Sequence, residues 1–155
     1  MTINDKVFGE LDYQYKWVGY RTIKFSGKDT KVALLIGGED DGSFDEGQYV
    51  AYSSLMDNWN NVQHNILQRI LKYYKQKRHE LGYDVSFSQD YPLIETVDQL
   101  IEHITLVGIS VPYEFLRDGR DIGISFDCSW DQENGLGIRL IDEKVEEVGY
   151  QDVAI

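Results

Sequence analysis

The sequence predicts an α+β domain in which a mainly antiparallel sheet packs against one long helix and one short helix. Between residues 45 and 80, apolar side chains recur every three or four positions, which places them on one side of an α-helix. The flanking segments contain β-branched and aromatic runs separated by glycine-containing turns, a pattern typical of β-meanders. We therefore expect about six or seven strands from two meanders. The length of 155 residues fits one domain over residues 1–155.

The first meander is expected within residues 6–37. Residues 6–11 form a short strand, and residues 15–25 form a longer one whose odd-numbered side chains share one face. A turn at residues 26–29 leads into residues 30–37, which are apolar on both faces. Such a strand belongs in the middle of a sheet.

The long helix is predicted over residues 45–80, and Ser43 and Glu46 have the spacing of a capping box at its start. At a rise of about 1.5 Å per residue, an unbroken helix of this length would span about 54 Å. That exceeds a compact domain of this size, so the helix should break or project. Short polar side chains compete with the helical backbone. The expected weak point is a group of asparagines: Asn58, Asn60 and Asn61.

Beyond the helix, residues 83–91 are polar and aromatic and are predicted to be irregular. Thr96 and Gln99 have the spacing of a second capping box, which begins the short amphipathic helix. Residues 106–115 then read as a strand. Pro112 confines that stretch to a sheet edge or a bulge, because proline cannot donate to the ladder.

The second meander contains a strand with a clear alternating pattern. The Asp-Gly pair at residues 118–119 predicts a hairpin turn. Residues 122–130 then alternate between apolar and polar, so that one face is core and the other is polar. After the Asn-Gly pair at residues 134–135, strands at 136–141 and 144–148 complete the meander.

Acidic residues are concentrated in the second half of the chain. Residues 81–155 contain 16 acidic and 4 basic side chains, a net charge of −12, whereas residues 1–80 contain 11 of each. This charge opposes binding to nucleic acid, whose phosphates attract basic surfaces. It favours either a solvated surface or docking of a basic protein partner. The basic side chains near the end of the long helix could also attract the acidic half of a second copy, which makes a homodimer a further possibility.

The sequence contains no apolar run approaching the ~20 residues of a membrane span. Its first residues lack the basic and apolar regions of a signal peptide. We therefore expect a cytoplasmic protein with no membrane contact. The single cysteine, Cys128, cannot form an internal disulfide and is expected to be a small buried residue.

No catalytic, metal-binding or cofactor-binding residues are predicted. The acidic, glycine-rich segment at residues 37–42 lacks the spacing of a calcium loop. His64, His79 and His103 lie apart without ligand spacing, and His64 and His103 are expected on polar, exposed helix sides. The sequence also lacks a nucleophile elbow and a dinucleotide fingerprint. These observations argue against an enzyme.

The segment WDQENGLGI at residues 130–138 resembles the closing W-D-x-E-x-G-L-G signature of a family of uncharacterised bacterial α+β domains. Other positions fit the same pattern: Trp17, Gly27, Lys28, residues 48–52, Gly149, Gln151 and Asp152. The resemblance implies no established reaction. Several members resemble products encoded beside secreted polymorphic toxins, which implies an immunity protein that neutralises a cognate toxin. Asn134 stands where the pattern leads us to expect a histidine, which argues against metal or acid–base chemistry there.

The leading hypothesis is therefore a non-catalytic protein-binding domain, with a toxin as its basic partner. Asp127 is expected to cluster with Asp121, Asp131 and Glu133 on the polar face of the strand at residues 122–130. The residues predicted to contact the partner are two aromatic and three acidic ones: Trp130, Asp131, Glu133, Tyr150 and Asp152.

Other interpretations stay open. The clustered carboxylates could serve a metal-dependent hydrolase. A tyrosine-rich face could bind a small ligand if a pocket separated the sheet from the helix. In the simplest structural interpretation, Trp130 is buried and the carboxylates are only solvated.

Overall fold

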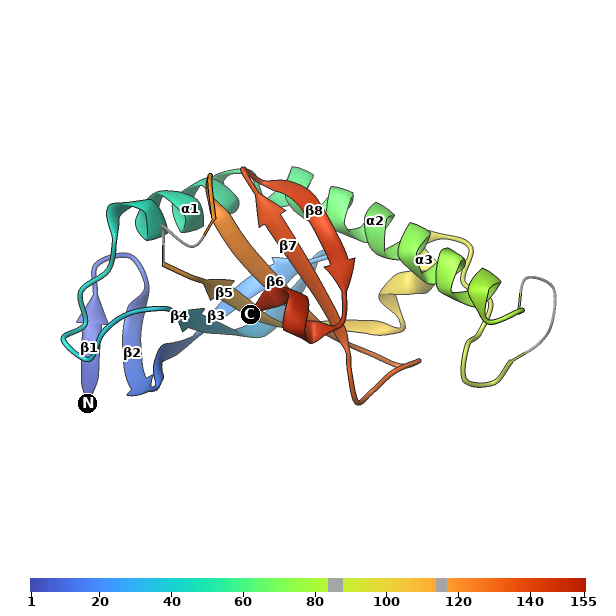
Figure 1. Ribbon diagram of the computed structural model, residues 1–155, viewed down its shortest axis with the longest axis horizontal. Coiled ribbons are helices and arrows are strands. Elements are labelled where there is room, and N and C mark those ends of the chain that lie inside the picture. The colour runs from blue at the N-terminus through green and yellow to red at the C-terminus, as the bar shows by residue number, and fades with distance from the viewer. Residues whose placement is uncertain (84–87, 114–116) are drawn as a thin grey trace.

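A computed structural model of the chain describes residues 1–83, 88–113 and 117–155, so the segment 83–91 predicted to be irregular lies partly outside the described residues. Within them, eight strands form one sheet and follow one another in chain order (Figure 1). The strands are β1 (Thr2–Asp5), β2 (Gly9–Gln14), β3 (Lys16–Phe25), β4 (Lys28–Ile36), β5 (Ile104–Val111), β6 (Asp121–Cys128), β7 (Leu136–Ile141) and β8 (Lys144–Gly149). The α+β class is confirmed and both meanders share one sheet, which is larger than the six or seven strands predicted.

The two halves of the sheet meet at a parallel pair of strands. β4 and β5 run parallel, with Ala33 opposite Gly108 and Ile36 opposite Val111, whereas the other neighbouring pairs are antiparallel. Parallel neighbours require a long crossover connection. It contains the helices α1 (Glu46–Asp57), α2 (Trp59–Glu80) and α3 (Val97–Ile101). Figure 1 shows α1 and α2 extending across one side of the sheet.

The N-terminal residues form a hairpin where the sequence predicts a single strand over residues 6–11. The carboxylate of Asp5 accepts hydrogen bonds from the backbone N–H groups of Val7 and Phe8, both at 2.9 Å. Gly9, with a φ of 76°, completes the turn between β1 and β2. Aspartate favours turns by bonding to the backbone just ahead of it. This turn chemistry outweighs the strand propensity of the apolar residues that follow Asp5.

The long helical segment is broken at Asn58, one of the asparagines at which the sequence predicts a break. The side-chain Nδ2 of Asn58 donates to the carbonyl oxygen of Ser54 at 2.8 Å and thereby satisfies a group at the end of α1. α2 then begins at Trp59, whose indole nitrogen donates to the carbonyl oxygen of Lys24 in β3 at 2.7 Å. Neither helix, nor any other in the described part of the chain, is long and apolar enough to cross a membrane.

The start of α1 differs from the prediction. Asp45 and Gln48 form the capping box, with the N–H of Asp45 donating to Gln48 Oε1 at 2.9 Å, rather than Ser43 and Glu46. Gln48 is buried, and its Nε2 also donates to carbonyl oxygens at the ends of β4 and β5, at 2.7 and 3.1 Å. These tertiary hydrogen bonds select Gln48, and the local sequence does not reveal them.

The segment from α3 to β5 follows the prediction in part. The capping box at the start of α3 is confirmed, because the N–H of Gln99 donates to Thr96 Oγ1 at 3.2 Å. β5 starts two residues before the predicted strand at residues 106–115 and ends directly before Pro112, which lacks the N–H that would continue the ladder. The last two residues of that prediction lie outside the described residues.

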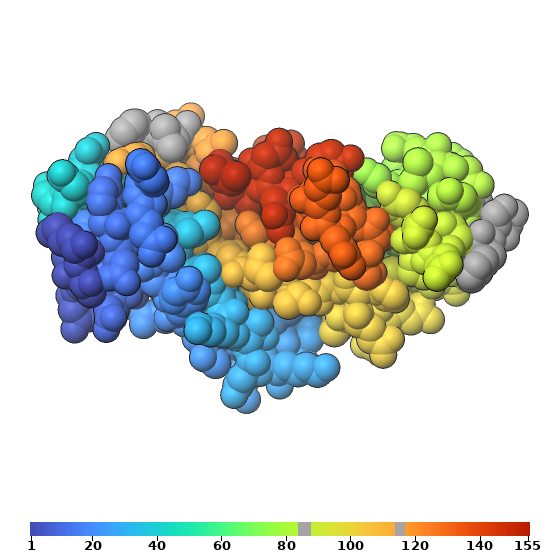
Figure 2. Space-filling view, turned by 90° about the horizontal axis from the view of Figure 1, so that it is seen from below, coloured from blue at the N-terminus to red at the C-terminus, as the bar shows by residue number. Residues whose placement is uncertain are grey.

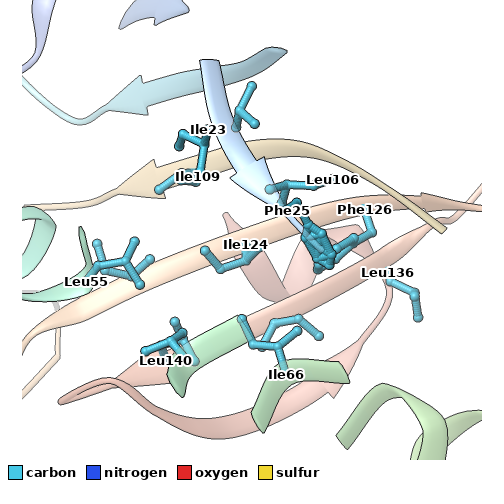
Figure 3. Packing of buried hydrophobic residues seen from close by; sticks show 14 of the residues in the cluster. Ile23, Phe25, Leu55, Ile66, Leu106, Ile109, Ile124, Phe126, Leu136 and Leu140 are labelled. Carbon is cyan, nitrogen blue, oxygen red and sulfur yellow. The ribbon is translucent and has the colours of Figure 1, made fainter. Parts of the chain in front are cut away.

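The hydrophobic core lies between the helices and one face of the sheet. The alternation predicted for β6 directs Ile124 and Phe126 into this core, and Figure 3 shows Ile124 between Leu55 of α1 and Phe126. Phe25 of β3 packs against Phe126 with 5.5 Å between the ring centroids. Burying each side chain of this size stabilises the fold by roughly 1.5–3 kcal/mol. The polar side chains of β6 therefore lie on the opposite side of the sheet, which we call the outer face.

Candidate functional site

The end of the chain folds back over the outer face of β6 and β7. Residues 150–155 contain the 3₁₀ helix η1 (Gln151–Ala154), and two strand glycines lie directly beneath them. A Cβ atom at Gly123 would lie 1.9 Å from the carbonyl oxygen of Ala154, and one at Gly137 would lie 2.3 Å from that of Tyr150. Only glycine permits so close a backbone approach. β6 and β7 are thus shaped to hold this segment.

A buried arginine anchors the same segment. Arg139 of β7 is only 3% exposed, and its Nη2 donates to the carbonyl oxygens of Val153 and Ile155, each at 2.9 Å. Its Nη1 pairs with Asp121 Oδ1 at 2.8 Å, and Asp121 Oδ2 accepts from Arg117 at 3.0 Å. Burial lowers the pKa of the Arg139 guanidinium, and the neighbouring Asp121 carboxylate opposes this shift. A buried charge requires such partners. The carbonyl groups of the final segment therefore stabilise the buried Arg139, and Arg139 in turn holds that segment in place.

The side chain of Gln151 connects η1 to the end of β6. Its Nε2 donates to the carbonyl oxygen of Phe126 at 2.8 Å and to Asp127 Oδ1 at 3.1 Å. The backbone N–H of Gln151 donates to the carbonyl oxygen of Asn134 at 3.0 Å. The final segment therefore holds both the Asp127 carboxylate and the loop that joins β6 to β7.

That loop, residues 129–135, is organised by Asp131. The Asp131 carboxylate accepts hydrogen bonds from the backbone N–H of Asn134 at 3.1 Å and from its side-chain amide at 3.1 and 3.3 Å. The carbonyl oxygen of Asp131 accepts from the N–H of Gly135 at 2.9 Å, and Gly135 has a φ of 60°. Asp131 thus closes the turn with Asn134 as its hydrogen-bond partner. Asn134 occupies the position where the resemblance implies a histidine.

Four carboxylates lie around this loop and η1: Asp127, Asp131, Glu133 and Asp152. We call them the acidic surface. Asp131 is partly buried and the other three are exposed, and Figure 2 shows the orange loop beside the red final segment. Within residues 1–83, 88–113 and 117–155, none of the four forms an ion pair. Their negative charges therefore add to a negative electrostatic potential on this part of the surface.

An aromatic residue and a lysine border the acidic surface. Tyr150 is 43% exposed, and its hydroxyl accepts a hydrogen bond from Lys77 Nζ of α2 at 3.1 Å. The Lys77 ammonium also lies 4.7 Å from the centroid of the Tyr150 ring. Burial acts to lower the pKa of Lys77, but the hydrogen bond and the neighbouring tyrosines raise it overall. This contact holds the aromatic ring in place.

A hollow of about 420 Å³ lies beside the acidic surface, where the start of β5 meets the end of β6. Its lining residues are Glu102, His103, Thr105, Asp127, Cys128, Ser129 and Gln132. His103 Nδ1 lies 2.8 Å from Ser129 Oγ, and the N–H of Ser129 donates to the carbonyl oxygen of His103 at 2.9 Å. His103 is thus partly buried and hydrogen-bonded, in contrast to the exposed position predicted for it.

A family model described as "Domain of unknown function (DUF6985)" matches residues 7–155. The chain belongs to this family. No curated protein and no solved structure matches it significantly. The matched residues run from the β1–β2 turn through η1 to residue 155 and include the acidic surface. The family description names no activity, so the toxin-antidote role implied by the resemblance stays a prediction.

The DUF6985 fold distributes the five predicted contact residues over different environments. Trp130 is only 7% exposed, and its ring centroid lies 4.4 Å from that of Tyr74 in α2, so its side chain belongs to the core. Glu133 and Asp152 are exposed, and neither side chain takes part in a described hydrogen bond. Asp131 and Tyr150 are held by the contacts given above. Four of the five therefore reach the surface.

The expected cluster of Asp121 with the other carboxylates is not formed. Asp121 is 4% exposed and pairs with Arg139, at the end of β6 opposite Asp127. The two-residue period of a strand correctly places both aspartates on the outer face, but their separation along β6 keeps them apart. In the described part of the DUF6985 domain, no group of three or more His, Cys, Asp or Glu side chains could hold a metal ion.

The sequence alone predicts neither the anchoring role of Arg139 nor the hollow, nor does it place Gly123 and Gly137 as a floor beneath the final segment. His103 and Ser129 are 26 positions apart and meet only because Ile104 pairs with Cys128 in the sheet. A signal for the floor was present, because Gly123 and Gly137 interrupt strands that are otherwise rich in side chains to pack. Glycine inside a strand often marks the close approach of another backbone. Cys128, predicted to be buried, is 3% exposed, which confirms that prediction.

Proposed function

We propose that this DUF6985 domain is a non-catalytic protein-binding domain whose acidic surface docks a basic protein. The observation that carries the proposal is that Asp127, Asp131, Glu133 and Asp152 lie around one loop and η1 without a cationic partner among the described residues. Complementary charge across an interface accelerates encounter and selects against wrong partners. A protein surface that leaves its carboxylates unpaired is suited to that use.

The support beneath the acidic surface strengthens the proposal. Arg139 fixes the final segment, Gln151 connects it to Asp127, and Asp131 closes the loop that carries Glu133. Backbone segments that are held before binding lose little conformational freedom when a partner arrives. Tyr150, held by Lys77, adds an aromatic contact of the kind that dominates many interfaces. Trp130 supports the loop from within the core.

We propose further that the partner is a toxin that this domain neutralises. A toxin that acts on nucleic acid requires a basic active site, and a carboxylate surface can cover such a site by replacing phosphate. The family resemblance described above also implies an immunity protein that neutralises a toxin. Nucleic acid itself is an unfavourable ligand for the acidic surface because the charges repel.

A second candidate function is the binding of a small polar ligand in the hollow beside Asp127. Its volume of about 420 Å³ lies within the ~300–1,000 Å³ typical of ligand pockets. The space between sheet and helix does not favour this function, because the core occupies it and buries Tyr52 and Tyr74. The metal-dependent hydrolase has no favouring observation among the described residues.

The experiment is quantitative capture from a lysate of the native bacterium with the tagged full chain as bait. Glu133→Lys/Asp152→Lys reverses two exposed charges without removing a described hydrogen bond. Glu146→Lys/Glu147→Lys makes the same charge change on exposed residues of β8 and serves as the matched control. We expect a basic protein that is captured by the wild type and the control, released by salt, and lost from the first variant.

Expression of the captured protein alone then tests the toxin assignment. Cells should stop growing, and co-expression of the wild-type domain should restore growth while the Glu133→Lys/Asp152→Lys variant should not. Capture that is equal for both variants would show that the acidic surface is not the binding site. If the captured protein is harmless by itself, the result would support the binding function and contradict the antidote role.

Assembly and location are further parts of the proposal. A second copy would place the exposed Lys72 and Lys75 of α2 on the acidic surface of its neighbour. Molar mass measured by light scattering at low and high salt tests this homodimer. Fractionation of the native bacterium tests the cytoplasmic location.

A further inference from the structure

The residues that line the hollow at the start of β5 are suited to bind a cationic side chain. Glu102 and Asp127 contribute carboxylates, and neither lysine nor arginine is among the described residues that line it. Thr105, Ser129 and Gln132 add oxygen atoms that can accept hydrogen bonds. The hollow is therefore rich in acceptors and carries net negative charge.

The walls of the hollow are held by contacts that do not fill it. Two hydrogen bonds between His103 and Ser129 join the α3–β5 connection to the end of β6. The amide of Gln151 donates to only one oxygen of the Asp127 carboxylate, Oδ1, at 3.1 Å. Asp127 is thus oriented, and its second oxygen has no described hydrogen-bond partner.

We propose that this hollow receives an arginine side chain of the basic partner. The inference rests on the proposed function and names the chemical group that the acidic surface selects. A guanidinium presents five N–H donors in a planar fork that matches a carboxylate, and it is more weakly hydrated than an ammonium. A site with two carboxylates and several neutral acceptors uses such a fork better than it uses the three donors of lysine. Asp127 belongs both to the hollow and to the acidic surface, so an arginine bound in the hollow would also contact that surface.

The experiment is an NMR titration of the isotope-labelled full chain with two small probes. N-acetyl-arginine amide carries the guanidinium, and N-acetyl-citrulline amide is nearly the same shape without the charge. We expect saturable shifts of the backbone amides of residues 102–105 and 127–132 with the arginine probe, weakened by salt. The citrulline probe should bind at least about tenfold more weakly.

Variants locate the binding within the hollow. Glu102→Gln/Asp127→Asn should weaken arginine binding at least about tenfold, while Glu146→Gln/Glu147→Gln, with the same loss of charge on β8, should leave it unchanged. Thr105→Lys, which introduces a tethered ammonium into the hollow, should block the probe with the carboxylates still present. The dispersion of each variant's spectrum reports whether it is folded.

Three results would overturn the inference. Equal binding of the citrulline probe would identify a general polar site. Shifts spread evenly over all acidic segments would indicate unspecific attraction. The absence of saturable shifts would show that the hollow does not bind arginine. The proposed function is tested separately. If Glu133→Lys/Asp152→Lys loses the captured protein but the arginine probe does not bind, the proposed function stands and the arginine site fails. If the arginine probe binds but no protein is captured, the arginine site stands and the proposed function fails.

Discussion

Arg139 and Asp121 form a buried ion pair, with 2.8 Å between Nη1 and Oδ1, and the same arginine donates to two carbonyl oxygens of the final segment. The ion pair lies on the outer face of the sheet, beneath residues that carry part of the acidic surface. One interaction thus supports both the fold and the position of Asp152. Its removal should affect both.

Arg139→Met is expected to destabilise the domain by about 3–5 kcal/mol, because it leaves the Asp121 carboxylate buried with Arg117 as its one ion-pair partner among the described residues. Urea unfolding measures this change. Arg120→Met, which removes a partly exposed pair with Glu143, should cost no more than about 1 kcal/mol. A loss of similar size for both variants would contradict a special role for the buried pair.

Gly123→Ala should displace the final segment, because the new methyl group would overlap the carbonyl of Ala154. We expect a loss of about 1–3 kcal/mol in the free energy of unfolding, with faster hydrogen exchange at residues 150–155. Gly108→Ala is the matched control, since the nearest atom would lie at an ordinary 3.7 Å. Unchanged exchange in the Gly123 variant would mean that the segment is not held against β6.

The stability of the N-terminal hairpin should depend on acid through Asp5. Burial acts to raise the pKa of Asp5, but hydrogen bonds from Phe8, Tyr49 and Val7 lower it overall from its ordinary value of 3.8. Unfolding therefore takes up a proton in acid, and the stabilisation that is present above pH 3.8 is lost as the pH falls through the lower folded-state pKa. Asp5→Asn should be less stable than the wild type at neutral pH and should converge toward it in acid. Parallel stability curves would refute this linkage.

Cys128 should be unreactive in the folded protein. Its side chain is buried, and burial raises the pKa of the thiol to about 11, so the reactive thiolate is scarce at neutral pH. Ellman's reagent should label the chain quickly in urea and slowly in buffer. Rapid labelling of the folded protein would mean that this side of the hollow opens in solution.

The parts of the fold that could be predicted are those governed by local sequence. The alternation in β6, the capping box of Thr96 and Gln99, and the break at Asn58 each depend on residues within one element. The N-terminal hairpin was not predicted because the apolar residues after Asp5 are equally compatible with a continuous strand. The turn forms because the Asp5 carboxylate accepts hydrogen bonds from the backbone of Val7 and Phe8.

The site was less predictable because it is assembled by tertiary contacts. Charge counting located the acidic half of the chain, and Glu133 and Asp152 do lie on the surface. The alternation over residues 122–130 places Trp130 with the core side chains, and the structure buries it against Tyr74 of α2, a neighbour that no local pattern specifies. The hollow required the pairing of β5 with β6, which no local pattern specifies.

The most direct test of the proposed function is the dissociation constant between the captured basic protein and three purified forms of the domain. The wild type and the Glu146→Lys/Glu147→Lys control should bind alike, with affinity that falls as salt is added. The Glu133→Lys/Asp152→Lys variant should bind at least about tenfold more weakly, mainly through slower association. Equal dissociation constants for all three forms would contradict the acidic surface as the binding site.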